Sequence, residues 1–127
     1  MGVAGRRILL AEDDRFLRKA AEAVLARHGY AVLTAGDGEE ALQIARAEQP
    51  DLILLDLIMP KLHGFEVLRR LKQDTGTRLI PVVVLSNLGQ ESDVEQAMAA
   101  GAVAYCIKAN LSLQELVRQV GDILTRS

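Results

Sequence analysis

The sequence contains no tryptophan, and only two phenylalanines and two tyrosines stand among its 127 residues. Half of the residues are hydrophobic, so a core has to be built from leucine, isoleucine, valine and alanine. The single cysteine, Cys106, excludes an internal disulfide framework and is typical of a protein from a reducing compartment. The balance of apolar and charged residues is that of a globular protein rather than a disordered one.

Long apolar runs and an excess of one charge are lacking as well. The net charge is -2, and no block of lysine and arginine with interleaved aromatics indicates nucleic-acid binding. No apolar stretch approaches the roughly 18 residues of a membrane span, and the run after Met1–Arg7 is too short for a secretory signal. We therefore expect a cytoplasmic protein with one domain over residues 1–127 and no output domain.

Short apolar runs alternate with amphipathic helical stretches, and the alternation occurs five times. Strands that are apolar on both faces and alternate with helices predict a parallel sheet covered on both sides. Right-handed crossovers then give a doubly wound (βα)5 flavodoxin-like sandwich, for which the strand order 2-1-3-4-5 is expected. The predicted strands are Ile8–Ala11, Ala31–Ala35, Leu52–Leu55, Val82–Leu85 and Val103–Ile107.

Capping residues mark the expected helix boundaries. Asp37 and Ser112 are each followed by a glutamate three residues later, a pattern that predicts helix starts. Gly29 and Gly101 are typical of helix ends, and Pro50 ends the second helix. No linker or low-complexity segment interrupts this pattern.

Polar residues end four of the predicted strands. In open α/β sheets, ligands bind beyond the carboxyl ends of the strands, near the point where the strand order reverses. The expected order places the first, third, fourth and fifth strands side by side, so their polar ends meet at one edge. These residues are Glu12, Asp13 and Asp14, then Asp56, then Ser86 and Asn87, and finally Lys108.

Each of these residues also has a simple structural interpretation. Asp14 fits the N-cap of the following helix as well as it fits an accessory site role. Taken alone, Asp56 is a solvated turn residue, Ser86 a loop hydroxyl and Lys108 a strand end whose ammonium reaches water. These interpretations do not explain why four residue types gather on one side of the sheet.

Phosphoryl transfer explains the combination. Clustered carboxylates repel one another, so Glu12, Asp13 and Asp56 need a cation, and their oxygens suit Mg²⁺. Aspartate is a known phosphoryl nucleophile. The transition state spreads negative charge over the equatorial oxygens, which Lys108 and Ser86 would neutralise. The sequence therefore predicts that Asp56 accepts a phosphoryl group.

Over its whole length the chain resembles the receiver domains of bacterial two-component response regulators, including single-domain regulators of the chemotaxis type. The similarity begins at Ile8–Asp14, and its most specific segment is Pro50–Pro60, followed by Gly64. The resemblance implies that Asp56 is phosphorylated by a sensor histidine kinase or a histidine phosphotransfer protein. Asp51, which opens the same strand, is then a structural residue.

The resemblance also implies a metal site and a switch. Glu12 and Asp13 match the acidic pair that binds Mg²⁺ or Mn²⁺ together with Asp56, and the backbone carbonyl of Ile58 matches the remaining protein ligand. The residues matching the phosphate-stabilising and switch groups are Ser86, Lys108 and Tyr105. For Tyr105, the alternative to a change of rotamer is a strand residue with its hydroxyl in water.

Three departures from the family pattern stand out. Lys108 is followed by Ala109 where the family usually has proline, often after a cis peptide. A cis bond before alanine would cost about 3 kcal/mol, so we expect a trans bond. Arg15 stands where proline or a small residue is common, and either approaches the phosphoryl site or faces solvent. Ile58 and Leu88 replace polar residues that often help to position an attacking water, which predicts slow loss of the phosphoryl group.

The predicted function is a phosphorylation-dependent switch that acts on an unidentified downstream protein, as a monomer or weak dimer. It would catalyse only its own phosphoryl transfer and slow dephosphorylation. A phosphatase of the haloacid dehalogenase class would need a second aspartate at Ile58 and a cap domain. A flavodoxin-like cofactor binder would need a glycine-rich phosphate loop in place of Glu12–Asp14. A degenerate receiver that binds partners without phosphate stays open, because the proline after Lys108 is missing.

Overall fold

Five parallel strands form the central sheet in the order β2-β1-β3-β4-β5. The computed structural model describes residues 5–126. The strands are β1 (Arg7–Ala11), β2 (Ala31–Ala35), β3 (Leu52–Asp56), β4 (Val82–Ser86) and β5 (Ala104–Ile107). The parallel pairing and the strand order confirm the predicted doubly wound fold.

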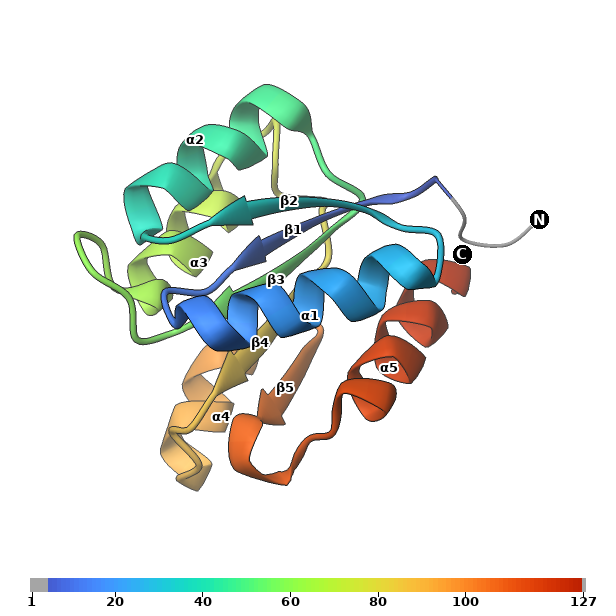
Figure 1. Ribbon diagram of the computed structural model, residues 1–127. Helices are drawn as coiled ribbons and strands as arrows, with labels where there is room; N and C mark the ends of the chain where they lie inside the picture. Colours follow the sequence, from blue (N-terminus) through green and yellow to red (C-terminus); the bar gives the residue numbers. More distant parts are fainter. Residues whose placement is uncertain (1–4, 127) are drawn as a thin grey trace.

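Helices cover both faces of this sheet (Figure 1). They are α1 (Arg15–Arg27), α2 (Gly38–Glu48), α3 (Gly64–Gln73), α4 (Glu91–Ala99) and α5 (Leu113–Thr125). The helices α1 and α5 lie on one face, and α2, α3 and α4 lie on the other (Figure 1). Within residues 5–126, no helix combines the length and apolar character needed to cross a membrane.

Alternate residues of each strand enter two separate hydrophobic clusters. In β1, Leu9 packs on the side of α2 and α3, whereas Ile8 and Leu10 pack on the side of α1 and α5. In β3, Ile53 and Leu54 divide in the same way. Successive side chains of a strand point to opposite faces, so each central strand is buried on both sides, as its continuous apolar run predicts.

Both predicted helix starts are confirmed, but each capping box forms only one of its two hydrogen bonds. The side chains of Asp37 and Ser112 accept hydrogen bonds from the backbone N–H groups of Glu40 and Glu115. The reciprocal bonds are not formed. Glu40 accepts from the N–H of Gly36 at 2.8 Å, and Glu115 pairs with an arginine one turn later. The boundaries are correct although the glutamates serve other contacts.

The fifth strand and its exit differ from the prediction. The strand begins at Ala104 rather than Val103, which is 39% exposed. A short 3-10 helix, η1 (Lys108–Asn110), follows the strand directly. No cis peptide is present among residues 5–126, so the Lys108–Ala109 bond is trans, as expected.

Candidate functional site

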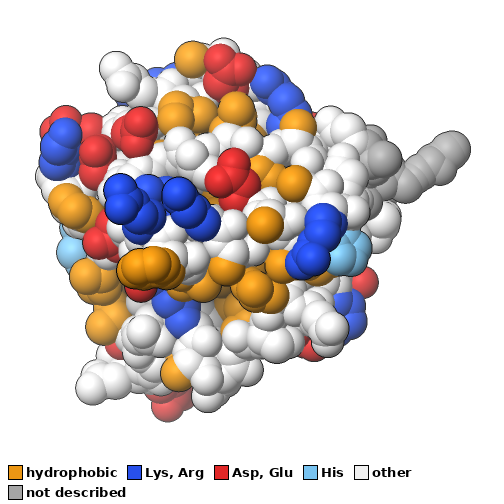
Figure 2. Space-filling view, in the orientation of Figure 1, with side chains coloured by type: hydrophobic (Ala, Val, Ile, Leu, Met, Phe, Trp, Pro, Cys, Tyr) orange, Lys and Arg blue, Asp and Glu red, His pale blue; other side chains and the backbone are white. Residues whose placement is uncertain are grey.

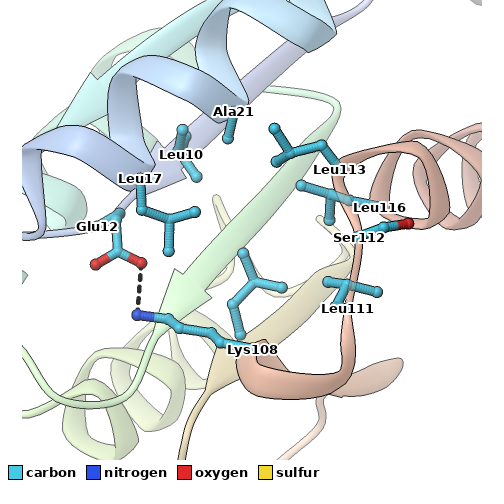
Figure 3. A pocket seen from close by; sticks show the side chains of 10 residues that line it. Leu10, Glu12, Leu17, Ala21, Lys108, Leu111, Ser112, Leu113 and Leu116 are labelled. Carbon is cyan, nitrogen blue, oxygen red and sulfur yellow. Dashed lines mark ion pairs between the residues drawn. The ribbon is translucent and has the colours of Figure 1, made fainter.

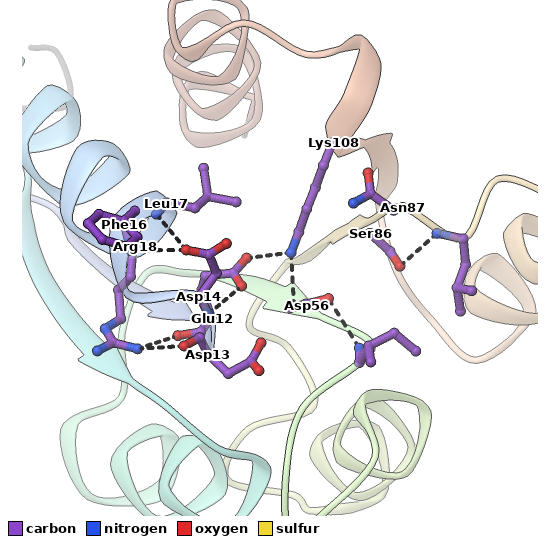
Figure 4. A network of polar contacts seen from close by, with 12 residues as sticks. Glu12, Asp13, Asp14, Phe16, Leu17, Arg18, Asp56, Ser86, Asn87 and Lys108 are labelled. Atoms are coloured by element: carbon purple, nitrogen blue, oxygen red, sulfur yellow. Dashed lines mark hydrogen bonds and ion pairs between the residues drawn. The ribbon is translucent and has the colours of Figure 1, made fainter.

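The carboxyl ends of the strands bring the predicted polar residues together at one edge of the sheet (Figure 4). Glu12 and Asp13 directly follow β1, Asp56 and Ser86 are the last residues of β3 and β4, and Lys108 opens η1. Because parallel strands end at the same edge, Lys108 and Asp56 meet although 52 positions separate them in the sequence. The strand order therefore brings these polar side chains to one edge of the sheet, as predicted.

Three carboxylates form the acidic part of this site. Glu12, Asp13 and Asp56 each offer an oxygen within 4.8 Å of the others. Glu12 is fully buried and Asp56 is 3% exposed, whereas Asp13 is open to solvent. Like charges at this distance oppose one another, and hard oxygen ligands with one side open to water suit a divalent cation such as Mg²⁺. The donor set therefore fits the metal that the sequence suggests.

Lys108 is the positive group among these carboxylates. Its Nζ donates a hydrogen bond to Asp56 Oδ2 at 2.9 Å and lies 2.7 Å from Glu12 Oε1 as an ion pair. Burial lowers the pKa of Lys108, but the two carboxylates outweigh burial and hold this pKa above its usual value. Lys108 is thus a firmly charged ammonium that is shared by two nearly buried acids.

Glu12 is only partly satisfied by that ion pair. Its Oε2 accepts a hydrogen bond from the N–H of Asp14 at 3.0 Å, while Oε1 faces Lys108 without good hydrogen-bond geometry. Burial raises the pKa of Glu12, and the neighbouring Lys108 reverses only part of that effect. The acid is therefore held in an unfavourable environment for its charge.

The loop after β3 is folded tightly against Asp56. The N–H of Ile58 donates to Asp56 Oδ1 at 3.1 Å, and the N–H of Gly64 donates to the carbonyl of Leu57 at 2.9 Å. A Cβ on Gly64 would lie 2.3 Å from Leu57 Cα and 2.6 Å from the Asp56 carbonyl oxygen. Only glycine permits this approach, so Gly64 fixes the backbone that carries Asp56.

Ser86 and Tyr105 are linked through one residue of the loop after β4. The buried Ser86 Oγ accepts a hydrogen bond from the N–H of Leu88 at 3.1 Å, and the hydroxyl of Tyr105 donates to the Leu88 carbonyl. Burial raises the pKa of Tyr105. The hydroxyl is therefore bonded to the protein, which differs from the simple alternative of a hydroxyl in water.

The predicted accessory residues have three different environments. Asp14 Oδ1 accepts from the N–H groups of Phe16 and Leu17, so its carboxylate caps α1 rather than facing the site. Arg15 is exposed and makes no hydrogen bond or ion pair within the described chain. Asn87 Oδ1 accepts a hydrogen bond from the backbone of the loop after β5.

Arg18 belongs to the site and is not singled out by the sequence pattern. Its Nη1 donates to the carbonyl of Glu12 at 2.7 Å and lies 3.5 Å from the carbonyl of Asp13 (Figure 4). The guanidinium thus holds the backbone of the acidic loop. An arginine in the first turns of a helix after an acidic run is a weak signal, because its side chain usually extends into solvent.

A small cavity of about 60 Å³ lies between α1 and the start of α5, and Lys108 is one of its lining residues (Figure 3). Its wall is formed mostly by leucines, and the Glu12–Lys108 ion pair stands at one end. Cofactor pockets usually exceed about 300 Å³. This cavity is therefore too small to hold a flavin-like cofactor.

The surface around α1 carries charges of both signs. Figure 2 shows lysine and arginine side chains interspersed with aspartate and glutamate on this face. The largest apolar exception is Phe16 in the first turn of α1, which is 86% exposed. An exposed aromatic ring thus lies close to the acidic loop (Figure 4).

The comparison with protein families identifies the class. Residues 8–120 match the model of the response regulator receiver domain. The chain therefore belongs to the receiver domain family of two-component response regulators, and this membership implies phosphorylation-dependent signalling.

Individual relatives agree with this assignment. The chain is 36% identical over 127 residues to the probable transcriptional regulator ycf27 of Cyanophora paradoxa, covering all of this chain and 52% of that protein. It is 40% identical over 119 residues to a gliding motility regulatory protein of Myxococcus xanthus, covering 94% of this chain and 15% of that protein. The chain spans about half the length, or less, of these curated relatives.

Solved structures have the same fold. A putative response regulator of Chloroflexus aurantiacus superposes with a TM-score of 0.89 at 34% identity, covering 96% of this chain and 99% of that one. The Vibrio cholerae chemotaxis protein CheY4 superposes with a TM-score of 0.87 at 26% identity, covering 94% and 99%. In each comparison, the similarity therefore extends over nearly the whole length of this chain and of the solved chain.

Proposed function

We propose that this receiver domain accepts a phosphoryl group on Asp56 from a sensor histidine kinase or a histidine phosphotransfer protein. The observation that carries the proposal is the position of Asp56, a nearly buried carboxylate between the Lys108 ammonium at 2.9 Å and two further acids within 4.8 Å. A carboxylate in this setting has a cation partner on one side and metal-ligand oxygens on the other.

The chemical step is an in-line displacement at phosphorus. A carboxylate oxygen of Asp56 attacks the phosphorus of the donor, a P–O bond forms, and the bond from phosphorus to the leaving imidazole nitrogen breaks. Lys108 already touches Asp56, so its ammonium can pair with a phosphoryl oxygen as negative charge develops there. The domain would catalyse only this transfer and the slow hydrolysis that reverses its effect.

Mg²⁺ or Mn²⁺ is the proposed cofactor. The residues that would hold it are Glu12, Asp13, Asp56 and the backbone carbonyl of Ile58. When bound, the ion supplies positive charge against the three carboxylates and the phosphoryl oxygens. Arg18 supports this role, because its bonds to the carbonyls of the acidic loop fix where the two N-terminal acids stand.

The proposed switch runs through the loop after β4. Ser86 Oγ is close to the site and bonded to the N–H of Leu88, so a Ser86 hydroxyl that turns to a phosphoryl oxygen would release that N–H. The carbonyl of the same residue holds the Tyr105 hydroxyl, which links the loop to β5. Phosphorylation would thereby change the face formed by α4, β5 and α5, where an unidentified downstream protein binds.

We also place this activity in the cytoplasm. The proposal follows from the single cysteine, Cys106, a buried thiol of the kind typical of reducing compartments.

The acidic loop lies beside the exposed Phe16, which would give a phosphodonor protein an apolar contact near the site.

The test is incubation with a small acyl phosphate and Mg²⁺, followed by the intact mass. Wild type and Asp51→Asn should each gain one phosphoryl group, because the Asp51 carboxylate has a structural role: it accepts a hydrogen bond from the N–H of Arg7 at 2.8 Å. Asp56→Asn should gain none. A wild-type protein that gains no phosphoryl group would support the degenerate receiver instead, and phosphorylation of Asp56→Asn would disprove the assignment of the acceptor.

A further inference from the structure

The loops after β4 and β5 are joined by one hydrogen bond from backbone to side chain. Asn87 Oδ1 accepts from the N–H of Ala109 at 3.1 Å, across 22 positions of sequence. Asn87 directly follows Ser86, and Ala109 directly follows Lys108 (Figure 4). The bond therefore connects the immediate neighbours of two site residues.

The turn that carries Lys108 has few other supports. Ala109 and Asn110 of η1 are exposed, so these two residues add no hydrophobic packing that would hold the turn in place. Its remaining backbone contact runs within the turn, from the N–H of Leu111 to the carbonyl of Lys108 at 3.2 Å. Among residues 5–126, the Asn87 bond is thus the hydrogen bond that ties the backbone of η1 to a different segment of the site.

The position of this turn matters because Lys108 works over a short range. Its Nζ meets Glu12 and Asp56 at 2.7 Å and 2.9 Å. The ammonium contacts two carboxylates at once, so a displacement of the backbone at Lys108 would lengthen at least one of these contacts. The partner segment is itself fixed, since Ser86 and Tyr105 both bond to Leu88 within the loop that carries Asn87.

We propose that Asn87 is a positioning residue, which holds the Ala109 N–H and so keeps Lys108 within reach of Asp56. The inference rests on the proposed function, because positioning is measured through transfer to Asp56. It requires a residue with an N–H group at position 109, and proline at that position could not donate. The amide of Asn87 presents its oxygen, since the partner is a donor.

The experiment compares Asn87→Ala in three backgrounds, with the rate of phosphorylation by a small acyl phosphate at saturating Mg²⁺ as the first readout. In the wild-type and Ala109→Gly backgrounds, the donor N–H is kept, and Asn87→Ala should slow transfer about three- to tenfold. In the Ala109→Pro background the donor is already lost, and Asn87→Ala should have no further effect. Asn110→Ala, an exposed asparagine of the same turn, serves as the matched control with a wild-type rate.

The second readout is the exchange of the Ala109 amide proton with solvent, measured by nuclear magnetic resonance, which needs no phosphorylation. Asn87→Ala should speed this exchange, because the N–H then loses its acceptor. An unchanged transfer rate in Asn87→Ala would overturn the inference, as would an equal effect in the Ala109→Pro background. If wild type gains no phosphoryl group, the proposed function fails, while unchanged exchange of the Ala109 amide in Asn87→Ala would separately rule out the role of Asn87.

Discussion

Lys108 lies slightly nearer to Glu12 than to the proposed acceptor, with its Nζ 2.7 Å from Glu12 Oε1 and 2.9 Å from Asp56 Oδ2. One ammonium therefore balances two nearly buried carboxylates. A divalent cation at the acidic cluster would compete with Lys108 for Glu12, and would leave the lysine free to follow the acceptor oxygen.

Replacing Lys108 by methionine tests this balance. Lys108→Met keeps the apolar stem but leaves two buried carboxylates without their cation, so we expect a loss of roughly 3 kcal/mol in unfolding free energy at neutral pH. Added Mg²⁺ should stabilise Lys108→Met more than wild type, because the metal replaces the missing charge. Urea unfolding with and without Mg²⁺ measures both effects.

Lys61→Met is the control for that experiment. Lys61 forms a solvent-exposed ion pair with Asp37 at 3.5 Å, so its loss should change stability by less than about 1 kcal/mol. If Lys108→Met is as stable as Lys61→Met in the absence of metal, the bridging role of Lys108 is wrong.

The raised pKa of Glu12 predicts how stability depends on pH. In the folded state this pKa lies above its usual value of 4.5, mainly because the acid is buried. The folded protein therefore loses stability as the pH rises through 4.5 towards the raised pKa, and the loss persists at neutral pH. Glu12→Gln should be more stable than wild type at neutral pH, and this gain should disappear below the usual pKa.

Glu66 provides a comparison of opposite sign. Hydrogen bonds from Arg69, then Arg70, lower the pKa of Glu66 to about 2. Its contribution is present above 4.5 and is lost as the pH falls towards 2, so Glu66→Gln should weaken the fold at neutral pH. Denaturant midpoints measured across this range should diverge for the two variants, and parallel curves would contradict the argument.

Two glycines should respond to alanine in opposite directions. Gly64→Ala forces a Cβ to within 2.3 Å of the Leu57 Cα, against backbone that cannot yield, and should cost about 1–3 kcal/mol. Gly121 lies inside α5, where a Cβ would sit 3.7 Å from the Tyr30 hydroxyl, an ordinary contact. Gly121→Ala should therefore stabilise by about 0.5–1 kcal/mol. Thermal unfolding of both variants checks the difference in sign.

We expect the lifetime of the proposed phosphorylated state to depend on the apolar residues around Asp56. Ile58 is 51% exposed beside Asp56 and has no group that can orient a water molecule. We expect loss of the phosphoryl group over minutes or longer, and Ile58→Gln should speed this loss about tenfold. Intact mass at intervals after removal of the phosphodonor gives the rate, with Ile58→Leu as control. A wild-type lifetime of seconds would contradict the prediction.

The strands were predictable because each central strand is buried on both faces. Continuous runs such as Leu52–Leu55 can only be accommodated inside a covered parallel sheet, and the strand order then determines which chain ends meet. The acidic cluster and Lys108 follow from that order alone. This part of the site needed no knowledge of side-chain conformation.

The remaining contacts could not be predicted, because they depend on the paths of loops and the rotamers of long side chains. From the sequence alone, Asp14 could be either a helix cap or an accessory residue of the site. Only its hydrogen bonds from the N–H groups of Phe16 and Leu17 identify it as the cap. Arg18 could have extended into solvent but turns back to the carbonyl of Glu12. The bond from Asn87 to Ala109 required the shape of η1, a turn without an apolar pattern of its own.

The absence of tryptophan gives the tyrosines an optical use. The chain has two tyrosines, and they belong to opposite edges of the sheet: Tyr30 directly precedes β2 and Tyr105 lies in β5. Tyr30 is buried in the hydrophobic cluster between the sheet and the helices α1 and α5. Tyr105 bonds to the loop that follows Ser86. The tyrosine part of the near-ultraviolet signal therefore comes from one ring away from the site and one beside it, so a change in this part on phosphorylation would report the surroundings of Tyr105 without any added label.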